Sequence, residues 1–275
     1  MKLLVFGLGY TARAFARRLG PEWSVIGTSR AGGAGGLRFD REHVLPITAF
    51  GEATHILVSV PPDEAGDPVL DSHRRDIAAL KGLRWLGYLS TTGVYGTRDG
   101  GWVDENSQLC PSSARAARRA AAEREWLGLG AQVFRLAGIY GPGRSAFDAL
   151  RAGTAKRIDA GGQVFSRIHV DDIATVLLTS IERARPKTKN GPAVYNVCDD
   201  EPAAQEAVVA RAAQLLGIEP PPLIPLAGAE LSPMARSFYA DNKRVSNALI
   251  KTELGVTLAY PSYREGLAAV LAAGG

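Results

Sequence analysis

Two glycines and a small residue with the spacing G-x-G-x-x-A stand near the start of the sequence, at Gly7, Gly9 and Ala12. They follow a short apolar run, Leu3–Phe6, of the kind that forms a buried parallel strand, and a helical pattern comes after them. The first glycine allows a tight turn, and the second lets the backbone approach a pyrophosphate without a Cβ in the way. The helix start would offer free N–H groups and a positive dipole end to the phosphates. The spacing predicts a dinucleotide site, and a glycine turn that serves packing alone is the alternative. The residues assigned to the phosphates are Gly7, Gly9, Tyr10, Thr11 and Ala12.

The residues that end the second predicted strand, Thr28, Ser29 and Arg30, bear on which nicotinamide dinucleotide would bind. An acidic side chain at this place accepts hydrogen bonds from the ribose 2′-OH of NAD and repels the 2′-phosphate of NADP. No Asp or Glu stands here. Arg30 instead offers a planar, permanently charged fork suited to phosphate, with two hydroxyls beside it. We therefore expect NADP as the cofactor, in preference to NAD.

Hydroxyl groups also stand at the end of a later predicted strand, at Ser90 and Thr91. Ligands of open α/β sheets bind at the carboxyl edge of the strands, so these hydroxyls can hydrogen-bond an oxygen of a substrate. Alternatively, they satisfy backbone groups at the strand end. The strand before it should pass beneath the ribose of the cofactor with its last residues, Ser59, Val60 and Pro61.

Strand-like and helical patterns alternate through the first half of the chain. The predicted strands are Leu3–Phe6, Ser24–Thr28, His55–Val60, Trp85–Ser90 and Gln132–Leu136, and the predicted helices are Thr11–Leu19, Asp71–Lys81 and Ser113–Leu127. This alternation indicates an α/β protein with a doubly wound parallel sheet, which brings the strand ends to one edge. A further helix, Gln205–Leu216, is followed by a proline-rich connection within a small second lobe.

Composition excludes several other classes of protein. The 275 residues are 46% hydrophobic, enough for a substantial core, and the net charge of +4 comes from interspersed basic and acidic residues. The arginine-rich stretch 115–124 reads as a solvated helix face and not as a nucleic-acid patch. Cys110 and Cys198 lack metal-ligand spacing, which indicates plain thiols in a reducing compartment and no metal site. The first strand begins at Lys2, and no apolar run is long enough to span a membrane, so we expect a soluble, cytoplasmic protein.

Several further segments carry a resemblance that covers nearly the whole chain. They are Leu89–Gly96 (LSTTGVYG), Arg135–Gly143 (RLAGIYGPG), Ile168–Ala174 (IHVDDIA), Tyr195–Val197 (YNV), Asn242–Arg244 (NKR), Leu254–Gly255 and Glu265–Leu267. In this order and spacing, the chain resembles the extended short-chain dehydrogenase/reductase family, the group of NAD-dependent sugar-nucleotide epimerases and dehydratases. The resemblance implies a Rossmann-like doubly wound sheet with a smaller C-terminal substrate lobe.

The resemblance also assigns roles and boundaries. Thr91 matches the catalytic Ser/Thr, Asp40 matches an aspartate that contacts adenine, and the turn after Tyr140 borders the nicotinamide in relatives. His169 is interpreted as a structural residue that precedes a helix beginning at Ile173. Residues 1–140 plus about 164–195 should form the dinucleotide-binding domain, and about 141–163 plus 196–275 the substrate lobe. Relatives often form dimers through the helices that correspond to Asp71–Lys81 and Ser113–Leu127, and the resemblance implies that this chain can form a homodimer in the same way.

The chain departs from the family where active relatives carry a Tyr-x-x-x-Lys pair. Alignment on Pro111 and Glu123 puts Arg115 at the tyrosine position and Arg119 at the lysine position. An arginine does not give up a proton at neutral pH, because its pKa exceeds about 12. Arg119 can still hydrogen-bond ribose hydroxyls, and Arg115 would place a fixed positive charge at an anionic substrate. The alternative is that both face water and pair with acidic neighbours.

Tyrosines elsewhere are candidates for the missing acid/base group. Tyr95 and Tyr140 lie in matched segments that border the site in relatives. The one literal Y-x-x-x-K, from Tyr239 to Lys243, falls in a segment that matches another part of the family, so we interpret it as coincidence. The predicted catalytic residues are therefore Thr91, Arg115, Arg119 and Tyr140.

Two functions remain open from the sequence. The first is an NADP-dependent oxidoreductase or epimerase-type enzyme with a rebuilt proton relay, acting on a small anionic or nucleotide-linked substrate. The second is a non-catalytic NADP-binding sensor or scaffold protein that uses the same crevice. Fold alone does not separate them, because function resides in the site.

Overall fold

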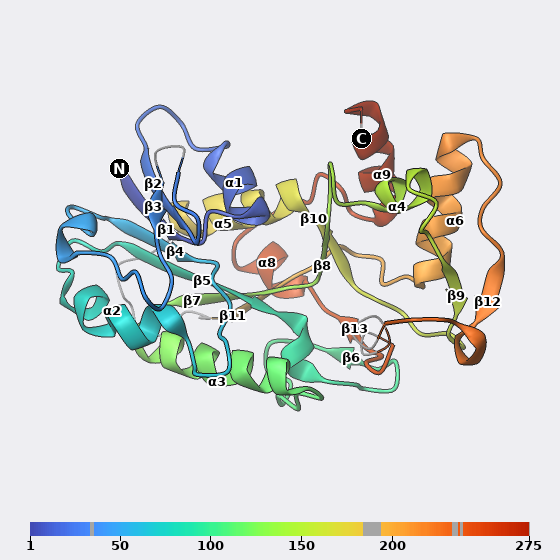
Figure 1. The fold of residues 1–275 in the computed structure, drawn as a ribbon, viewed down its shortest axis with the longest axis horizontal. Coiled ribbons are helices and arrows are strands. Elements are labelled where there is room, and N and C mark those ends of the chain that lie inside the picture. Colours follow the sequence, from blue (N-terminus) through green and yellow to red (C-terminus); the bar gives the residue numbers. More distant parts are fainter. Residues whose placement is uncertain (34–35, 184–193, 233–235, 237–238, 275) are drawn as a thin grey trace.

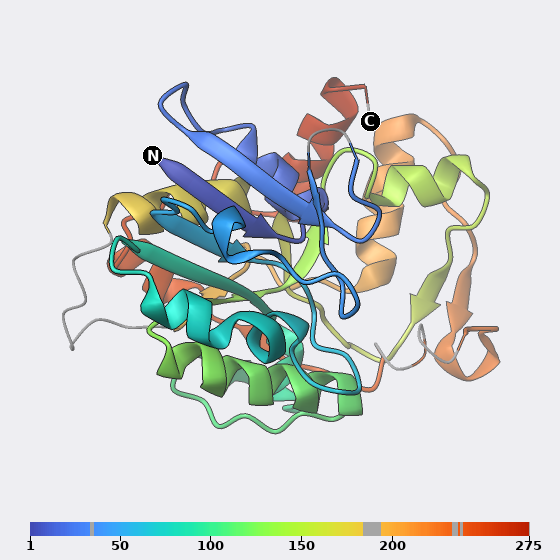
Figure 2. The same cartoon turned by 60° about the vertical axis from the view of Figure 1, so that its left-hand side comes forward.

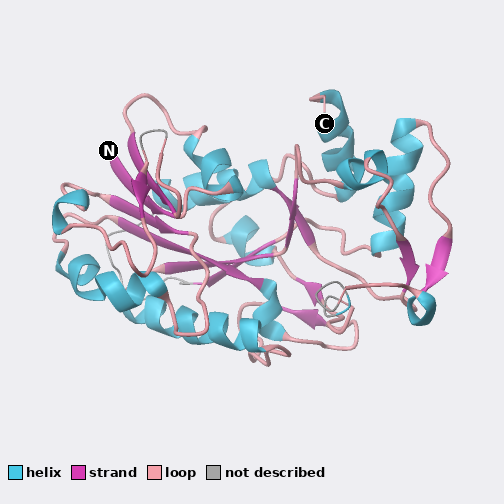
Figure 3. Cartoon of the chain, in the orientation of Figure 1, coloured by secondary structure: helices cyan, strands magenta, loops and turns pink. Residues whose placement is uncertain are grey.

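The computed structural model describes residues 1–33, 36–183, 194–232, 236 and 239–274. Its central element is a parallel sheet of seven strands, with helices on both faces (Figures 1 and 3). In spatial order the strands are β11 (Val194–Val197), β7 (Gln132–Leu136), β5 (Trp85–Thr91), β4 (His55–Val58), β1 (Lys2–Phe6), β2 (Ser24–Ser29) and β3 (Leu37–Arg38). The expected doubly wound parallel sheet is confirmed.

The order of the strands reverses between β1 and β4. From β1 the chain winds outward to β2 and β3, then returns to the other side of β1 and continues through β4, β5, β7 and β11. Phe6 at the end of β1 lies opposite Val58 at the end of β4. Ligands of open α/β sheets bind in the crevice outside the strand ends at such a reversal. The glycine loop begins one residue beyond Phe6, so it lies at this point.

Alternate residues of the central strands feed two separate cores. In β1, Leu3 and Val5 belong to one apolar cluster, and Leu4 and Phe6 belong to the other. Because both faces are covered, the strand reads as a continuous apolar run. One face carries α1 (Tyr10–Ala16), α5 (Val170–Glu182) and α8 (Ala248–Thr252), and the other carries α2 (Pro68–Ala79) and α3 (Ala114–Gly128), as Figure 1 shows.

Two helices begin earlier than the sequence pattern predicts, because of their caps. Helix α2 begins at Pro68, where Asp67 accepts hydrogen bonds from two first-turn N–H groups. Helix α5 begins at Val170, three residues before the predicted start, because His169 Nδ1 accepts from the N–H of Asp171 at 3.2 Å. His169 therefore caps the helix.

A smaller lobe lies to one side of the sheet, at the right of Figure 2. It contains α4 (Ala146–Arg151), β9 (Arg157–Asp159), α6 (Gln205–Leu216), β12 (Leu223–Pro225), a 3-10 turn at Leu226–Gly228 and α9 (Tyr263–Ala272). Strands β9 and β12 pair in parallel, and Phe147, Val208 and Leu267 belong to the core of this lobe.

Short elements join the two parts. Strand β8 (Gly138–Tyr140) pairs with β10 (Arg167–His169), and β6 (Trp102–Val103) pairs with β13 (Arg244–Val245). Two 3-10 turns complete the described elements, η1 (Ile47–Ala49) and η2 (Thr92–Tyr95). Within residues 244–252, which the sequence-based boundary places in the smaller lobe, β13 pairs with β6 and α8 packs against β11 of the large sheet. Of the helices in the described residues, none is long and apolar enough to cross a membrane.

Candidate active site

The glycine loop is held against the ends of two strands. Gly7 has φ +87°, and a Cβ there would lie 3.0 Å from the Val60 side chain and 3.2 Å from its backbone nitrogen. The Gly7 N–H donates to the Thr28 hydroxyl at 3.0 Å, and the Leu8 N–H donates to the Thr28 carbonyl at 2.7 Å. Thr28 is 1% exposed. Its hydroxyl therefore positions the loop.

The space beside Gly9 is open. A Cβ built there meets no atom within 4 Å, in contrast to Gly7. Helix α1 starts directly after it, with no side-chain cap and no acidic residue in the first turn. The first N–H groups of a helix are unsatisfied and favour an anion. The space beside Gly9 and the free N–H groups of α1 fit the pyrophosphate of a dinucleotide. A Cβ at residue 9 would occupy part of that space.

Tyr10 turns toward the second lobe. Its hydroxyl donates to the Pro142 carbonyl at 3.0 Å, and the Arg144 guanidinium lies 5.8 Å from the centre of its ring. Thr11, the next residue, is buried and reaches the wall of the cavity described below. Tyr10 therefore links the glycine loop to the turn after Tyr140.

At the end of β2, the side chains of Ser29 and Arg30 differ in what they contact. The Ser29 hydroxyl donates to the Gly32 carbonyl at 3.2 Å. Arg30 is exposed. Its guanidinium has no hydrogen bond or ion pair within the part of the chain that the structure describes.

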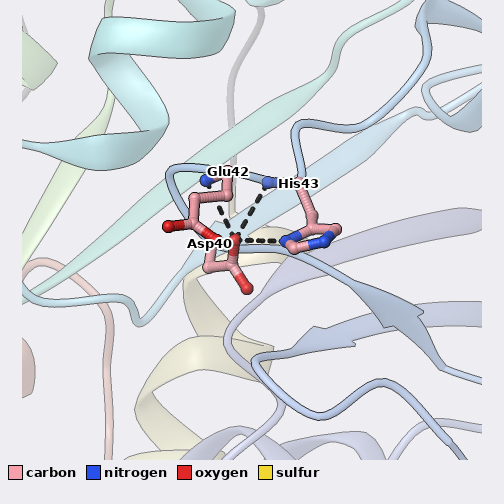
Figure 4. A group of neighbouring side chains, drawn as sticks. All are labelled: Asp40, Glu42 and His43. Carbon is pink, nitrogen blue, oxygen red and sulfur yellow. Dashed lines mark hydrogen bonds and ion pairs between the residues drawn. The ribbon is translucent and has the colours of Figure 1, made fainter.

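Asp40 organises its own turn (Figure 4). One carboxylate oxygen accepts from the N–H groups of Glu42 and His43, both at 2.9 Å, and lies 2.7 Å from His43 Nδ1. The hydrogen bond with His43 is the main reason that the pKa of Asp40 falls to about 2. Asp40, Glu42 and His43 place potential metal ligands within 4.8 Å of one another. We assign no metal there, because the central oxygen is already committed to the turn.

A cavity of about 1270 Å³ lies between the large sheet and the smaller lobe. It brings together seven of the residues predicted for the site, and they line its wall from the glycine loop to helix α3. They are Thr11, Ser59, Ser90, Thr91, Arg115, Arg119 and Tyr140. The other predicted cofactor residues lie along the ends of β1, β2 and β4 and in the turn that Asp40 organises.

The two hydroxyls at the end of β5 have different partners. Thr91 Oγ1 accepts from the Gly93 N–H at 3.2 Å and so caps η2. Its own hydrogen has no acceptor among the described residues, so it can point into the cavity. The Ser90 hydroxyl donates to the Glu123 carboxylate and is buried.

Ser90 belongs to a buried polar network that the sequence pattern does not reveal. Arg135 contacts Glu123 through Nε and Nη2, at 3.2 and 2.8 Å to the two carboxylate oxygens, and donates from Nη1 to the Tyr95 hydroxyl at 2.8 Å. Tyr95 donates in turn to Asn196 Oδ1 at 2.8 Å. Burial raises the pKa of Tyr95 to about 12. The network leaves Tyr95 no free hydroxyl to serve the cavity.

The chain was compared with known protein families, sequences and structures. No family model matches the chain. It is 49% identical to a functionally unknown conserved protein from Silicibacter pomeroyi DSS, covering 99% of this chain and 98% of that one with a TM-score of 0.90. It is 25% identical over 244 residues to protein YeeZ of Escherichia coli (strain K12), covering 80% of this chain and 85% of YeeZ.

Other structures share the fold at lower identity. Human epimerase family protein SDR39U1, solved with NADPH, has a TM-score of 0.73 at 18% identity and covers 98% of this chain and 99% of its own. Sugar-nucleotide dehydratases and epimerases solved with NAD align at 15 to 17% identity. The chain has the fold of the extended short-chain dehydrogenase/reductases. The Rossmann-like fold that the sequence motifs imply is confirmed in the structure.

Within this fold, the two arginines of α3 occupy different surroundings. Arg119 donates from Nη1 to the Leu89 carbonyl at 2.8 Å and to the Tyr88 hydroxyl at 3.2 Å. Arg115 is exposed at the cavity wall and has no partner within the described residues. Glu123 pairs with Arg135, and not with either of them.

Tyr140 is committed to the second lobe. Its hydroxyl donates to the Ser262 carbonyl at 3.3 Å, and a Cβ on Gly266 of α9 would collide with its ring. Burial raises the pKa of Tyr140 well above its usual range. The ring packs edge-on against His169 at 5.3 Å. Tyr140 therefore lines the cavity and contacts both lobes, through His169 before α5 and through Ser262 before α9.

The structure brings Tyr239 and Lys243 into the same cavity, although the sequence analysis set the pair aside as coincidence. Tyr239 packs edge-on against Phe165 at 5.7 Å between ring centres. Lys243 donates to Asp241 at 3.3 Å, and Asp241 accepts from the Ser112 hydroxyl at 2.6 Å. The literal Y-x-x-x-K spacing was the only signal for these residues.

Positive charge predominates in the cavity lining. Its cations are Arg115, Arg119, Arg144, Lys156, Arg167 and Lys243, and its carboxylates are Asp148 and Asp241. Arg167 is buried and donates to the carbonyls of Phe165 and Ala203. Arg115 and Arg144 have no acidic partner among the described residues, so they are the charges available to an anion.

Proposed function

We propose that this protein binds NADP(H) in the crevice and is an oxidoreductase or epimerase-type enzyme acting on a small anionic or nucleotide-linked substrate. One observation carries the proposal. A single cavity connects the buried Thr11 of the glycine-loop helix with the Thr91 hydroxyl and the unpaired Arg115. A cofactor held at the strand ends would meet a substrate at the centre of that cavity.

The preference for NADP rests on the end of β2. Arg30 has no carboxylate partner among the described residues. NAD-specific sites carry an Asp or Glu at the end of β2 that binds the ribose, and this chain has neither there. Asp40, the aspartate predicted to contact adenine, accepts hydrogen bonds from the N–H groups of its own turn. Human SDR39U1, which shares the fold, was solved with NADPH, whereas other structures of this fold hold NAD.

The residues of the chain would divide the work as follows. When bound, the nicotinamide supplies or accepts a hydride. Thr91 would donate a hydrogen bond to the substrate oxygen at the reacting carbon, because its hydroxyl hydrogen is unused. Arg115 would hold the anionic group of the substrate, since its guanidinium fork matches carboxylate and phosphate geometry.

A second function, a non-catalytic NADP-binding sensor or scaffold, has support of its own. Arg119 is bonded to β5, and the hydroxyls of Tyr95 and Tyr140 are bonded to other protein groups. None of these three is free to serve as an acid/base group. The two functions share the cofactor and differ in turnover.

Calorimetric titration of NADPH and NADH tests the shared part. We expect wild type to bind NADPH more tightly than NADH. Arg30→Ala should weaken NADPH binding about tenfold or more, because a charge-assisted hydrogen bond contributes about 1.5–3 kcal/mol, and should leave NADH unchanged. Arg75→Ala, an exposed arginine on α2, is the matched control and should change neither affinity. If neither nucleotide binds wild type, the glycine loop serves packing alone and the proposal fails.

Turnover distinguishes the enzyme from the sensor. With NADP(H) bound, a panel of small anionic carbonyl compounds and sugar nucleotides is screened for loss of NADPH absorbance, which detects a reductase. Because an epimerase regenerates its cofactor in each cycle, the same panel is also screened for new products by NMR. The enzyme is supported if wild type turns over a compound and Thr91→Ala turns it over more slowly while binding NADPH with unchanged affinity. Tight NADPH binding with no turnover on any compound of the panel favours the sensor.

A further inference from the structure

We propose that Lys243 exchanges the proton with the substrate oxygen, in place of the Tyr-x-x-x-Lys pair. This inference rests on the proposed function and names the acid/base group that it lacks. It starts from geometry. Lys243 is 9% exposed, lines the cavity that Thr91 and Arg115 also line, and stands directly before β13.

The position of Lys243 is fixed relative to α3. Ser112 stands just before the cap of that helix and donates to Asp241 Oδ1 at 2.6 Å, while Lys243 donates to Oδ2 of the same carboxylate at 3.3 Å. Arg115, at the tyrosine position of the family, is three residues beyond Ser112. The amine is therefore tethered at the same end of the helix where active relatives present their tyrosine.

Both lobes hold the backbone around this amine. Gln163 Nε2 donates to the Asp241 carbonyl at 2.8 Å, and the Val164 N–H donates to Asn242 Oδ1 at 3.2 Å. From the other side, the Arg98 N–H donates to the Asn242 carbonyl at 2.8 Å. A group anchored at this junction keeps its place relative to both cofactor and substrate.

The other ionisable groups of the cavity are less suited to the task. Its arginines do not titrate near neutrality. Burial raises the pKa of Tyr239 and Tyr263 away from neutrality. Asp148 accepts two hydrogen bonds from Ser145, and Lys156 donates to the Glu230 carbonyl at 2.5 Å.

The electrostatic surroundings favour a titratable amine. Burial lowers the pKa of Lys243, the Asp241 carboxylate opposes this, and the Arg98 guanidinium adds to the lowering. Burial shifts the pKa of a lysine readily, and a lysine shifted in this way can act as a general base. Asp241 would keep the ammonium oriented when the proton is present.

The step balances as a carbonyl reduction. A bound reduced nicotinamide would supply the hydride that the carbonyl carbon gains, and the π electrons of the C=O bond would move to oxygen. The ammonium of Lys243 gives one proton to that oxygen, which becomes a hydroxyl, and the neutral amine regains its proton from water. The carbonyl is reduced, the nicotinamide is oxidised, and the reverse direction uses the neutral amine as base.

Trace acetylation with limiting acetic anhydride measures the amine directly. Wild-type protein is labelled from pH 6 to 10, and each lysine is quantified by mass spectrometry, with the exposed Lys81 as reference. We expect Lys243 to reach half-maximal labelling at least one pH unit below Lys81. Saturating NADPH should slow the labelling of Lys243 at least threefold and leave Lys81 unchanged, because a bound nicotinamide would fill part of the cavity that Lys243 lines. Asp241→Asn should lower the pH midpoint of Lys243 further.

Three variants separate proton transfer from folding and binding. Lys243→Met and Lys243→Arg should keep the wild-type melting temperature and bind NADPH within twofold of wild type. With a substrate from the screen, both should lower kcat at least 100-fold, because neither exchanges a proton at neutral pH. Lys81→Met, the matched control, should keep full activity.

The outcomes are distinct. If NADPH does not bind wild type, the proposed function fails and this inference falls with it. If NADPH binds but Lys243 titrates with Lys81, or NADPH does not slow its labelling, the inference alone is overturned. Retained kcat in Lys243→Met overturns it as well.

Discussion

The cofactor edge and the substrate end of the cavity are built in different ways. At the cofactor edge, Gly7, Gly9 and Thr28 act through backbone geometry and lie within 22 consecutive residues. At the substrate end, Thr91, Arg115 and Lys243 act through side chains from three distant segments. A site formed by backbone groups depends on a local sequence pattern. A site formed by side chains from distant segments depends on the tertiary structure that brings those segments together. The predictions below test that difference.

The largest effect is expected behind the substrate end. Glu123→Ala should destabilise the fold by about 3–5 kcal/mol, because it leaves the Arg135 guanidinium buried without its carboxylate. The double variant Glu123→Leu/Arg135→Met should recover much of this loss, since it removes both charges. Urea unfolding of the three proteins measures it. Equal stability of Glu123→Ala and wild type would show that the network does not support the site.

A smaller, pH-dependent effect is expected at Asp199, which follows β11 and is 1% exposed. Burial raises its pKa to about 8, and Arg167 opposes the rise. Because the unfolded carboxyl titrates near 4, the folded state of wild type loses stability as pH rises from about 4 to about 8. Asp199→Asn does not titrate, so its stability relative to wild type should rise by about 4 kcal/mol between pH 5 and pH 9.

Urea unfolding at pH 5, 7 and 9 measures this difference. The difference between the two proteins isolates Asp199 from the other titrating groups. A stability difference between variant and wild type that stays constant from pH 5 to pH 9 would mean that Asp199 is already ionised in the folded protein at pH 5.

The sequence predicted the cofactor edge better than the substrate end for the same physical reason. The run Leu3–Phe6, its glycines and the alternating strands fix the sheet because their signal is local. The surroundings of Glu123 are not predictable in this way, because Arg135, Tyr95 and Asn196 meet it only after β5, β7 and β11 pair. The sequence interpretation treats Lys243 as coincidence because its segment matches another part of the family, whereas long-range contacts place it in the cavity. Helices α2 and α5 begin earlier than predicted because Asp67 and His169 cap them, and hydrophobic periodicity carries no signal of a cap.

The two glycines of the loop offer the finest test of the contrast, through effects of opposite kind. At Gly9 an added Cβ meets no protein atom within 4 Å, so Gly9→Ala should leave the melting temperature within about 2 °C of wild type. It should weaken NADPH binding about tenfold, because the Cβ occupies the space a pyrophosphate needs. Gly7→Ala should instead lower stability by about 1–3 kcal/mol, since its φ of +87° and the contact with Val60 exclude a side chain. Calorimetry and thermal melts on both variants separate the two roles. Gly9→Ala with unchanged NADPH affinity would move the phosphates away from this loop and leave the cofactor edge as a packing turn.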